Sequence, residues 1–509
     1  MLRRAWAILT LKAEMMILRD MSDEDTDDSV RDKDFQPSSE GESSRDDAQQ
    51  NRKKASAIMT YSNNPSTSED DFGEANTQVN DENNDTWYLP RGQQMQFGEF
   101  REYFGVSPTV IEELVQGHPK NFYMAVVEDS IFQMIADQTN IYATQQLENH
   151  SNISASSRLH QWNATSSAEI KRFFGLIAYM GLVKIPYIKD YWSRDPIFKT
   201  EFASIVMPRN RFEILLRMIH FANNDECREG DRLHKIQGLV DKLVQNFEAL
   251  YHPGESVCAD ELLIPFGGRL IMRQYMKQKR HKYGIKLFKL CTGHGYTLRL
   301  KIYAGKNLEV GKTTPTSVVM ELCESVLNVG RTVYTDNWYT SIDLANKLLD
   351  KRTHLVGTLR RNKKNVPKEV TQKSEIKRGE IISKENIKGI TVLNWKDKRN
   401  VIMLSTKHTN ETVDVPKRNG ESVTKPKVVA DYNKAKSSVD LSDQMAAYSS
   451  PLRKTVKWYK KLAIELLLST ALINAYILYR ECTGNVIGIV DFRKEVVRYL
   501  VSCTDEHQQ

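Results

Sequence analysis

Four aspartates stand where the sequence pattern changes from one kind of secondary structure to another. Asp260 lies within "SVCADELLIPF", and Asp336 ends the apolar approach of "VYTDNWYTS". Asp440 and Asp443 stand three residues apart in "SSVDLSDQM", a spacing that places both on one face of a helix. Short carboxylates on rigid elements are hard oxygen ligands of the kind that Mg²⁺ prefers. A single aspartate at a strand end is, however, more often a turn former or the cap of the next helix.

The elements that must position these aspartates follow from the hydrophobic periodicity. From Glu255 the pattern predicts a first strand in "SVCADELLIPF" and a hairpin formed by "KLFKLCT" and "TLRLKIYAG". A helix, "TPTSVVMELCESVLN", begins at Thr314. "RTVYTD" is then a strand, "TSIDLANKLLD" a helix with Thr340 and Asp343 in capping positions, and "THLVGTLR" another strand.

This order of elements predicts the fold class. Three antiparallel strands followed by alternating helix and strand is the order of a ribonuclease-H-like α/β core, a mixed sheet with helices on its faces. In such a core two carboxylates come from neighbouring strands and a third from a later helix. Asp260 in the first strand and Asp336 at the end of the fourth strand fall where this geometry needs them.

Helical patterns flank the predicted core on both sides. "SSAEIKRFFGLIAYMGLV" opens with Ser166 and Glu169 in capping-box spacing, and "MPRNRFEILLRMIHFAN" and "IQGLVDKLVQNFEALY" are further amphipathic helices. The Lys-rich stretch after residue 361 contains a hairpin, "ITVLNWKDKRNVIMLST", and is interpreted as an inserted subdomain. After it, a helix capped by Ser437 or Ser438 is predicted.

Composition divides the 509 residues into an acidic leader and a basic body. Residues 20–86 hold 19 acidic and 6 basic residues, whereas the whole chain has a formal net charge of +7. Such a leader has too little apolar surface to fold, and a basic body favours a polyanionic partner such as DNA. The six cysteines include no C-x-x-C pair, which favours a reducing compartment. The apolar stretch 462–479 contains Glu465 and Asn474, so we expect a buried helix and no membrane span.

Six stretches of the chain occur in the order in which the piggyBac transposases and the cellular proteins derived from them carry them. They are "DRLHKIQGLVDKL", "ADELLIPFGGR", "KYGIK", "YTDNWYTS", "LVGTLRRNKKNVP" and "DYNKAKSSVDLSDQM". The chain resembles this family from about residue 90 to 500. The resemblance and the patterns together predict a disordered acidic leader over 1–90, a helical dimerisation and DNA-binding domain over 91–254 and 451–509, a catalytic core over 255–362 and 421–450, and an insertion over 363–420.

The resemblance implies roles for particular residues. Asp260, Asp336 and Asp440 match the family's catalytic triad, and Asp443 matches a fourth acidic position. Two Mg²⁺ (or Mn²⁺) ions are then expected, because two ions about 4 Å apart can activate an attacking oxygen and stabilise a leaving oxygen at phosphorus. The candidate DNA-binding residues are Arg360 and Lys363 by resemblance, Trp458 with its neighbour Lys457, and Arg280 and Lys282 from the basic "KQKRHKYGIK".

Each of these residues has a simpler alternative role. Asp443 could only add charge near a helix start, Trp458 could be a core anchor, and the basic residues around Lys282 could be a solvated face. Glu261 is left out of the candidate site, because successive residues of a strand face opposite sides and it should point away from Asp260.

The expected activity is cut-and-paste DNA transposition with cleavage and joining at TTAA sites. The expected partners are double-stranded DNA at the transposon ends and target, and a second copy of the chain in a homodimer, with no membrane; the expected location is the nucleus. Many family members end in a cysteine-rich zinc-binding domain, and no such cluster follows here. The alternative is therefore a domesticated DNA-binding or regulatory protein that keeps the fold without transposing.

Overall fold

The computed structural model describes residues 86–149, 157–277, 279, 281–305, 314–372, 376–416, 422–453 and 457–504. The predicted disorder of residues 1–85 lies outside this range. The last residues of the predicted leader, which was expected to extend to residue 90, are ordered. Trp87–Tyr88 form strand β1 and pair antiparallel with β10, Ile381–Asn386. The backbone pairing with β10 orders a segment whose own sequence carries little structural signal.

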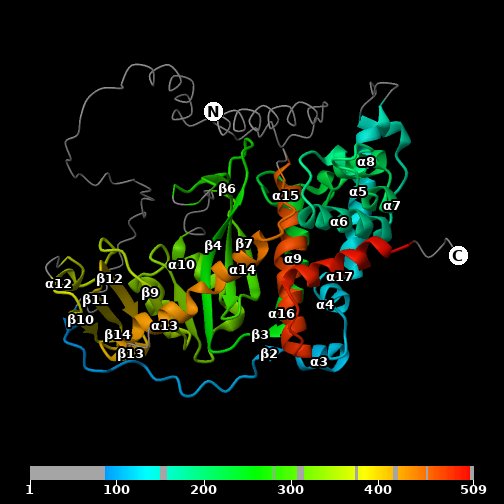
Figure 1. Ribbon diagram of the computed structural model, residues 1–509. Helices are drawn as coiled ribbons and strands as arrows, with labels where there is room; N and C mark the ends of the chain where they lie inside the picture. The colour runs from blue at the N-terminus through cyan, green and yellow to red at the C-terminus, as the bar shows by residue number, and fades with distance from the viewer. Residues whose placement is uncertain are drawn as a thin grey trace, which may run out of the picture.

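A mixed sheet with helices on both faces forms the centre of the molecule (Figure 1). Its central elements are β4 (Ser256–Pro265), β6 (Tyr283–Thr292), β7 (Thr297–Ile302), α10 (Pro315–Leu322), β8 (Thr332–Thr335), α11 (Ile342–Asp350) and β9 (His354–Thr358). Strand β6 pairs antiparallel with both β4 and β7, whereas β8 pairs parallel with both β4 and β9. The predicted order of three strands, helix, strand, helix and strand is therefore present.

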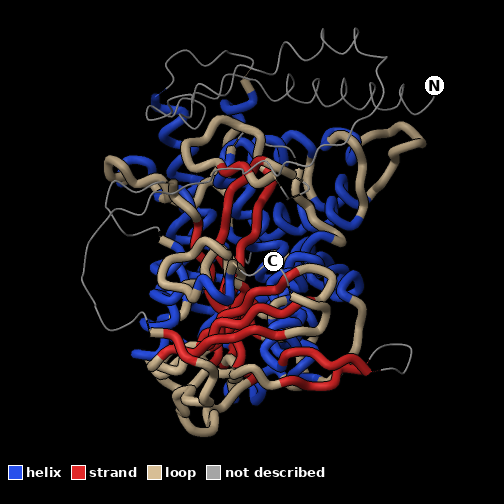
Figure 2. Tube along the Cα trace, turned by 90° about the vertical axis from the view of Figure 1, so that its left-hand side faces the viewer, coloured by secondary structure: helices blue, strands red, loops and turns tan. Residues whose placement is uncertain are grey.

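The strands of the predicted insertion extend this same sheet. Strand β12 (Asn400–Ser405) pairs antiparallel with β9, and β11 (Thr391–Lys396) joins β12 to β10. The strands run as β1-β10-β11-β12-β9-β8-β4-β6, with β5 (Gln274–Tyr275) and β7 also on β6. Figure 2 shows the strands, in red, gathered through the middle of the molecule among the helices. Two separate strand pairs are β2 (Gly105–Val106) with β3 (Tyr251–His252) and β13 (Thr412–Pro416) with β14 (Ser422–Pro426).

Two layers of helices cover the two faces of the central strands. Helices α10 and α11 pack in the larger hydrophobic core, whereas α13 (Lys427–Ala435) and α14 (Ser437–Ala447) cover a second apolar cluster on the other face. Thr314 caps α10 by accepting a hydrogen bond from the backbone N–H of Ser317, as predicted.

Two predicted caps are wrong. Ser341, not Thr340, caps α11, because the Thr340 hydroxyl donates to the backbone carbonyl of Asp336. Neither predicted serine caps α14, since α13 leads into it through Lys436 in helical conformation. The Ser438 hydroxyl instead donates to the carbonyl of Ala435.

The remaining helices form a bundle beside the sheet. They are α3 (Pro108–Leu114), α4 (Pro119–Val126), α5 (Asp129–Asn149), α6 (Ser167–Leu182), α7 (Phe202–Val206), α8 (Arg209–Met218), α9 (His234–Leu250), α15 (Trp458–Glu465), α16 (Ala471–Thr483) and α17 (Ile489–Ser502), while the short α12 (Lys368–Thr371) lies near β11. Ser166 is the N-cap of α6 and accepts from the backbone N–H of Glu169, which confirms the predicted helix start.

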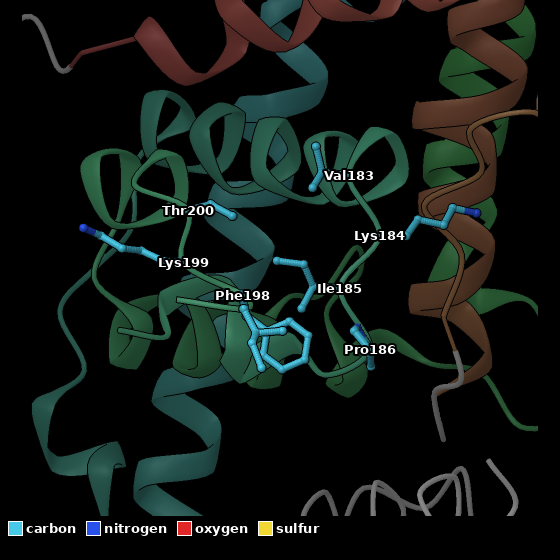
Figure 3. A pocket seen from close by; sticks show the side chains of 8 residues that line it. Val183, Lys184, Ile185, Pro186, Phe198, Lys199 and Thr200 are labelled. Atoms are coloured by element: carbon cyan, nitrogen blue, oxygen red, sulfur yellow. The ribbon is translucent and has the colours of Figure 1, made fainter. Parts of the chain in front are cut away.

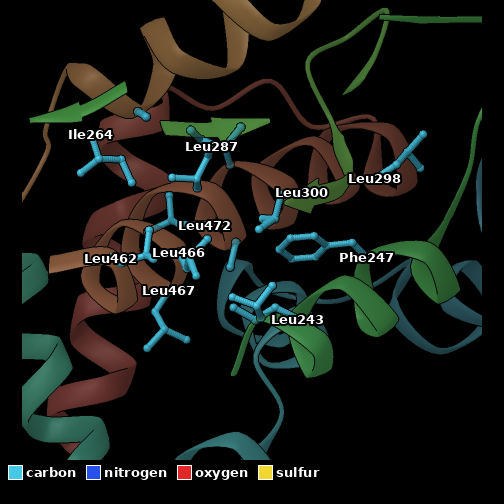
Figure 4. Close-up of a cluster of buried hydrophobic side chains, with 14 of the residues drawn as sticks. Leu243, Phe247, Ile264, Leu287, Leu298, Leu300, Leu462, Leu466, Leu467 and Leu472 are labelled. Atoms are coloured by element: carbon cyan, nitrogen blue, oxygen red, sulfur yellow. The ribbon is translucent and has the colours of Figure 1, made fainter. Parts of the chain in front are cut away.

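One long helix joins the bundle to the sheet. α15, a π-helical segment at Leu466–Thr470 and α16 run without a break over Trp458–Thr483. It is long and apolar enough to cross a membrane, yet 94% of its most apolar window is buried inside the protein. Its leucines pack against Phe247 of α9 and Leu298 of β7 (Figure 4). Asn474 exchanges two 2.8 Å hydrogen bonds with the backbone of Thr297, so the expected buried helix is present.

Candidate active site

Asp260 and Asp336 lie side by side at the centre of the sheet. In the parallel ladder between β4 and β8, Ala259 is paired with Thr335; Asp260 is the next residue of β4, and Asp336 directly follows the end of β8. All four residues of β8, "TVYT", are buried, and this packing fixes the end of the strand that Asp336 directly follows. Register alone therefore brings together two carboxylates that are 76 residues apart in the sequence.

Local hydrogen bonds hold each of these carboxylates. Asp336 Oδ1 accepts from the backbone N–H of Trp338 at 2.8 Å, and the backbone carbonyl of Asp336 accepts from the N–H of Thr340 at 3.1 Å. Asp260 Oδ1 accepts from the N–H of Glu261 at 2.8 Å. Asp336 thus forms the turn that leads into α11, as expected of an aspartate at a strand end. The hydrogen bonds of this turn also orient its carboxylate.

Asp440 approaches from helix α14 on the face of the sheet that Cys258 occupies. It lies in the first turn of α14 and is exposed to solvent. Burial raises the pKa of the Cys258 thiol, and the charges of Asp260, Asp440 and Asp336 all raise it further. All three candidate carboxylates therefore lie around one buried thiol.

The two strand aspartates carry perturbed pKa values. Burial, followed by the charges of Glu261 and Asp336, raises the pKa of Asp260 from 3.8 to about 8. Burial and then the charge of Glu261 raise the pKa of Asp336, although the Arg360 guanidinium opposes this. Carboxylates that lack a compensating cation show this pattern, and perturbed pKa values of this kind are concentrated at functional sites.

The donor set fits a hard divalent cation at Asp260 and Asp336. Both are short carboxylates on adjacent strands, and a bound cation would offset the repulsion that raises their pKa values. Within the described residues, however, no three His, Cys, Asp or Glu side chains are gathered closely enough to hold a metal ion. The structure thus brings two of the predicted ligands together on adjacent strands and places Asp440 on the facing helix.

Asp443, the predicted fourth acidic residue, has another partner. Its Oδ1 atom lies 3.1 Å from the Nζ atom of Lys289 in β6, and the lysine side chain is 1% exposed. Sequence reasoning did not single out Lys289. A signal was present, since a lysine at an inward position of the apolar strand "KLFKLCT" needs a buried partner.

Glu261, which sequence reasoning set aside, bears directly on the candidate site. Its Oε2 atom accepts from the Tyr339 hydroxyl at 3.0 Å and lies 4.0 Å from Lys286 Nζ. Tyr339 belongs to the turn after Asp336, so this contact links the glutamate to the segment that follows the second aspartate. The alternation rule predicts which side a residue faces, but it does not predict which loop crosses that side.

Two of the candidate DNA-binding residues lie against the turn that carries Asp336. Exposed Arg360 donates from Nε to Asn337 Oδ1 at 3.0 Å, and Lys363 donates from Nζ to the carbonyl of Trp338 at 3.2 Å. A phosphate bound by these cations would therefore lie beside the candidate carboxylates.

The basic segment between β5 and β6 is described only in part. Arg280 lies outside the described residues, and Lys282 is exposed. Tyr275 and Tyr283 are 48% and 50% exposed, with ring centroids 4.9 Å apart, and the Arg273 guanidinium lies 4.8 Å from the Tyr283 ring. Exposed rings beside cations suit a nucleic acid backbone and bases better than they suit a merely solvated face.

Lys457 and Trp458 have a different environment from the one predicted. Their exposed fractions are 7% and 5%, and Trp458 packs edge-on against Tyr459 in the main hydrophobic core. The predicted DNA contact of Trp458 is therefore corrected to the core-anchor alternative, because the indole is buried at the start of the long helix. Neither side chain is accessible to DNA in this conformation.

Two cavities lie outside the candidate site. One, of about 320 Å³, is lined by Val183, Pro186 and Phe198 in the helical bundle (Figure 3). The other, of about 610 Å³, lies between α9, β7 and α10. Neither of these two cavities is lined by any of the candidate carboxylates.

Comparisons with known proteins agree with this arrangement. A family described as "Transposase IS4" matches residues 118–476. The human piggyBac transposable element-derived protein 3 is 25% identical over 400 residues, which cover 74% of this chain and 64% of that protein. For the human piggyBac transposable element-derived protein 2 the identity is 24% over 418 residues, which cover 77% of this chain and 67% of that protein. The match thus spans about two thirds of the length of these relatives.

A solved structure matches over a similar extent. The cryo-EM structure of a piggyBac transposase synaptic complex with hairpin DNA aligns with a TM-score of 0.68 and 25% identity, and it covers 79% of this chain and 83% of that chain. The family match extends over more than half of the sequence and includes both strand aspartates and Asp440. On the combined grounds of sequence match and fold, the chain belongs to the piggyBac transposase family.

Proposed function

We propose that the protein is a metal-dependent DNA transposase that cleaves strands at element ends and joins them at TTAA sites. The observation that carries the proposal is the register of β4 and β8, which places Asp260 beside Asp336 while α14 presents Asp440 to the same face. The strand order β7-β6-β4-β8-β9, with the first three antiparallel and the last two parallel to β4, supports a ribonuclease-H-like core.

The chain's own residues have separable tasks in this proposal. Asp260 and Asp336, with Asp440 from α14, would hold Mg²⁺ or Mn²⁺, which when bound activates an attacking oxygen and stabilises a leaving oxygen at phosphorus. Arg360 and Lys363 position the DNA backbone beside Asp336, since both already contact the turn that follows it. The hydrogen bonds of the Asp336 turn fix the carboxylate before DNA arrives.

Strand cleavage by the purified full-length protein tests this function. The substrate is a labelled duplex that contains TTAA next to candidate terminal repeats from the flanking genomic DNA, incubated with Mg²⁺ or Mn²⁺. We expect metal-dependent nicking that falls at least about 100-fold in Asp336→Asn and is unchanged in the control Asp350→Asn, an exposed aspartate at the end of α11. Metal-independent nicking, or equal nicking by the two variants, contradicts the proposal.

A second candidate function is a domesticated DNA-binding protein that keeps the fold without transposing. What favours it is that the described residues contain no assembled group of three His, Cys, Asp or Glu ligands. This hypothesis predicts salt-dependent retention of DNA with no cleavage in either metal. Loss of retention at low salt would exclude this second function as well.

Partners and location belong to the same proposal. The solved relative is a synaptic complex with hairpin DNA, which supports double-stranded DNA as the partner here. A homodimer and a nuclear location follow from the proposed activity, since two element ends must be held together where the DNA lies. Light scattering of the purified chain, alone and with DNA, measures the first of these.

A further inference from the structure

Lys289 connects the sheet to the helix that carries Asp440. It stands in β6 directly opposite Asp260 of β4, so the two side chains project from the same face of the sheet. Its Nζ atom lies 3.1 Å from Asp443 Oδ1 of α14, three residues after Asp440. The lysine therefore reaches the helix from the sheet position next to Asp260.

Burial makes this ion pair a strong constraint. The Lys289 side chain is 1% exposed and that of Asp443 is 23% exposed, so an unpaired ammonium here would be costly. Burial by itself lowers the pKa of Lys289, but the charges of Asp443 and of Glu465 in α15 outweigh it, and the pKa is raised. The 3.1 Å contact with Asp443 therefore ties β6 to α14.

A second contact, with the β6–β7 turn, leaves α14 little room to move. A Cβ atom at Gly295, in the β6–β7 turn, would lie 3.3 Å from both Ser438 O and Ser442 N. Gly295 also has a φ of +87°, a conformation that favours glycine. The β6–β7 turn and the Lys289–Asp443 ion pair together hold the part of α14 between Ser438 and Asp443, which contains Asp440.

We propose that Lys289 is a positioning residue, which holds α14 through Asp443 and thereby places Asp440 over the strand aspartates. Asp443 is then engaged by the lysine and is not a metal ligand. The inference rests on the proposed function, because it assigns to Asp440 the metal-binding role described above. It differs from the family expectation for Asp443, which the sequence resemblance had placed at the metal.

The stability of the pair is measured first, by thermal unfolding of the full-length protein. Lys289→Met and Asp443→Asn should each lower the melting temperature, by roughly 5 °C or more, because each leaves a buried partner uncompensated. The double variant should recover most of the loss. The matched control is Lys347→Met, which breaks a Lys347–Asp343 pair of the same 3.1 Å length that is more than half exposed on α11, and it should change little.

Metal binding then separates a positioning role from a merely structural one. Calorimetric titration with Mn²⁺, well below the melting temperature, should show affinity about 10- to 100-fold weaker for Lys289→Met and for Asp443→Asn alike. Lys289→Arg should retain most of the affinity. In an Asp440→Asn background, Lys289→Met should cause no further loss, because the carboxylate that it positions is already gone.

Three outcomes overturn the inference in distinguishable ways. If Asp443→Asn weakens Mn²⁺ binding while Lys289→Met strengthens it, Asp443 is a metal ligand and the lysine competes with the cation. If both variants melt earlier but bind Mn²⁺ normally, the pair is structural only. If the unchanged protein binds no Mn²⁺, the proposed function itself fails and the positioning role fails with it.

Discussion

Neutralising Asp260 should make the metal-free protein more stable. The carboxyl group has a pKa raised from 3.8 to about 8 by burial and by the charges of Glu261 and Asp336. A folded structure that holds a carboxyl group in this state is destabilised near neutral pH, because the unfolded chain can ionise the group freely. Asp260→Asn keeps the shape and removes the titration, so it isolates the electrostatic cost.

The magnitude follows from the two pKa values. One pH unit corresponds to about 1.4 kcal/mol, so the interval from 3.8 to pH 7 sets an upper limit of roughly 4 kcal/mol. The carboxylate is partly exposed and interacts with Asp336, which reduces this to about 1–2 kcal/mol. For a chain of this size we expect a rise in melting temperature of roughly 1–2 °C.

The stability difference between Asp260→Asn and the unchanged protein should depend on pH in a definite direction. Below about pH 4 the carboxyl group is protonated in both folded and unfolded states, and the variant should match the unchanged protein. Between about pH 4 and pH 8 the unfolded chain loses the proton while the folded chain retains it, so the advantage of Asp260→Asn should grow. Above about pH 8 it should level off. Melting temperatures from calorimetry at several pH values, without added metal, measure this.

Two comparisons complete the experiment. Mg²⁺ should raise the melting temperature of the unchanged protein and leave that of Asp260→Asn nearly unchanged, since bound cations stabilise only the form that binds them. Asp350→Asn, at an exposed position, should shift stability by less than about 0.5 kcal/mol at every pH. An Asp260→Asn protein that melts earlier than the unchanged one across the whole pH range would refute the reasoning, because the carboxylate would then be a structural group.

Four further variants test other parts of the structure. Trp458→Ala should lower the free energy of unfolding in denaturant titrations by about 3–5 kcal/mol, because it empties a buried core position. The DNA affinity of the folded fraction should not change. Normal stability with weakened DNA binding would instead support a DNA contact by Trp458. Arg360→Ala and Lys282→Ala should each reduce the slope of log affinity against log salt by about 1 in DNA-binding titrations, and unaltered slopes would remove these residues from the interface. Asn474→Ala should lower stability by about 1–3 kcal/mol, because both backbone groups of Thr297 lose a buried partner; a change within experimental error would show that they find another partner.

The sequence predicted the elements well because their signals are local. The strand pattern, the capping positions of Ser166 and Thr314 and the order of the core elements depend on neighbouring residues, and the structure contains all of them. The start of α14 was less predictable, because α13 runs into it through Lys436 and no capping side chain is needed. Local propensity cannot anticipate such tertiary continuity.

In the candidate site, too, the features set by local sequence were predictable, and those set by tertiary packing were not. The adjacency of Asp260 and Asp336 followed from the predicted strand order, since parallel neighbours meet at matching ends. The contact between Asp443 and Lys289, and the burial of Trp458, depend on which surfaces pack together across distant parts of the chain. The sequence around a basic residue is the same whether the side chain faces DNA or a buried carboxylate. The partner of Lys289 and the burial of Trp458 could therefore be assigned only from the structure.

A ligand-exchange experiment tests most directly whether the carboxylate of Asp336 works through a metal ion. Asp336→Cys replaces a hard oxygen donor with a softer sulfur donor at the same turn, and softer donors bind Mn²⁺ in preference to Mg²⁺. We expect no DNA cleavage by Asp336→Cys in Mg²⁺ and partial recovery in Mn²⁺, with Asp336→Ala inactive in both. Cleavage by Asp336→Cys that is equal in the two metals, or activity of Asp336→Ala in either, would contradict this expectation.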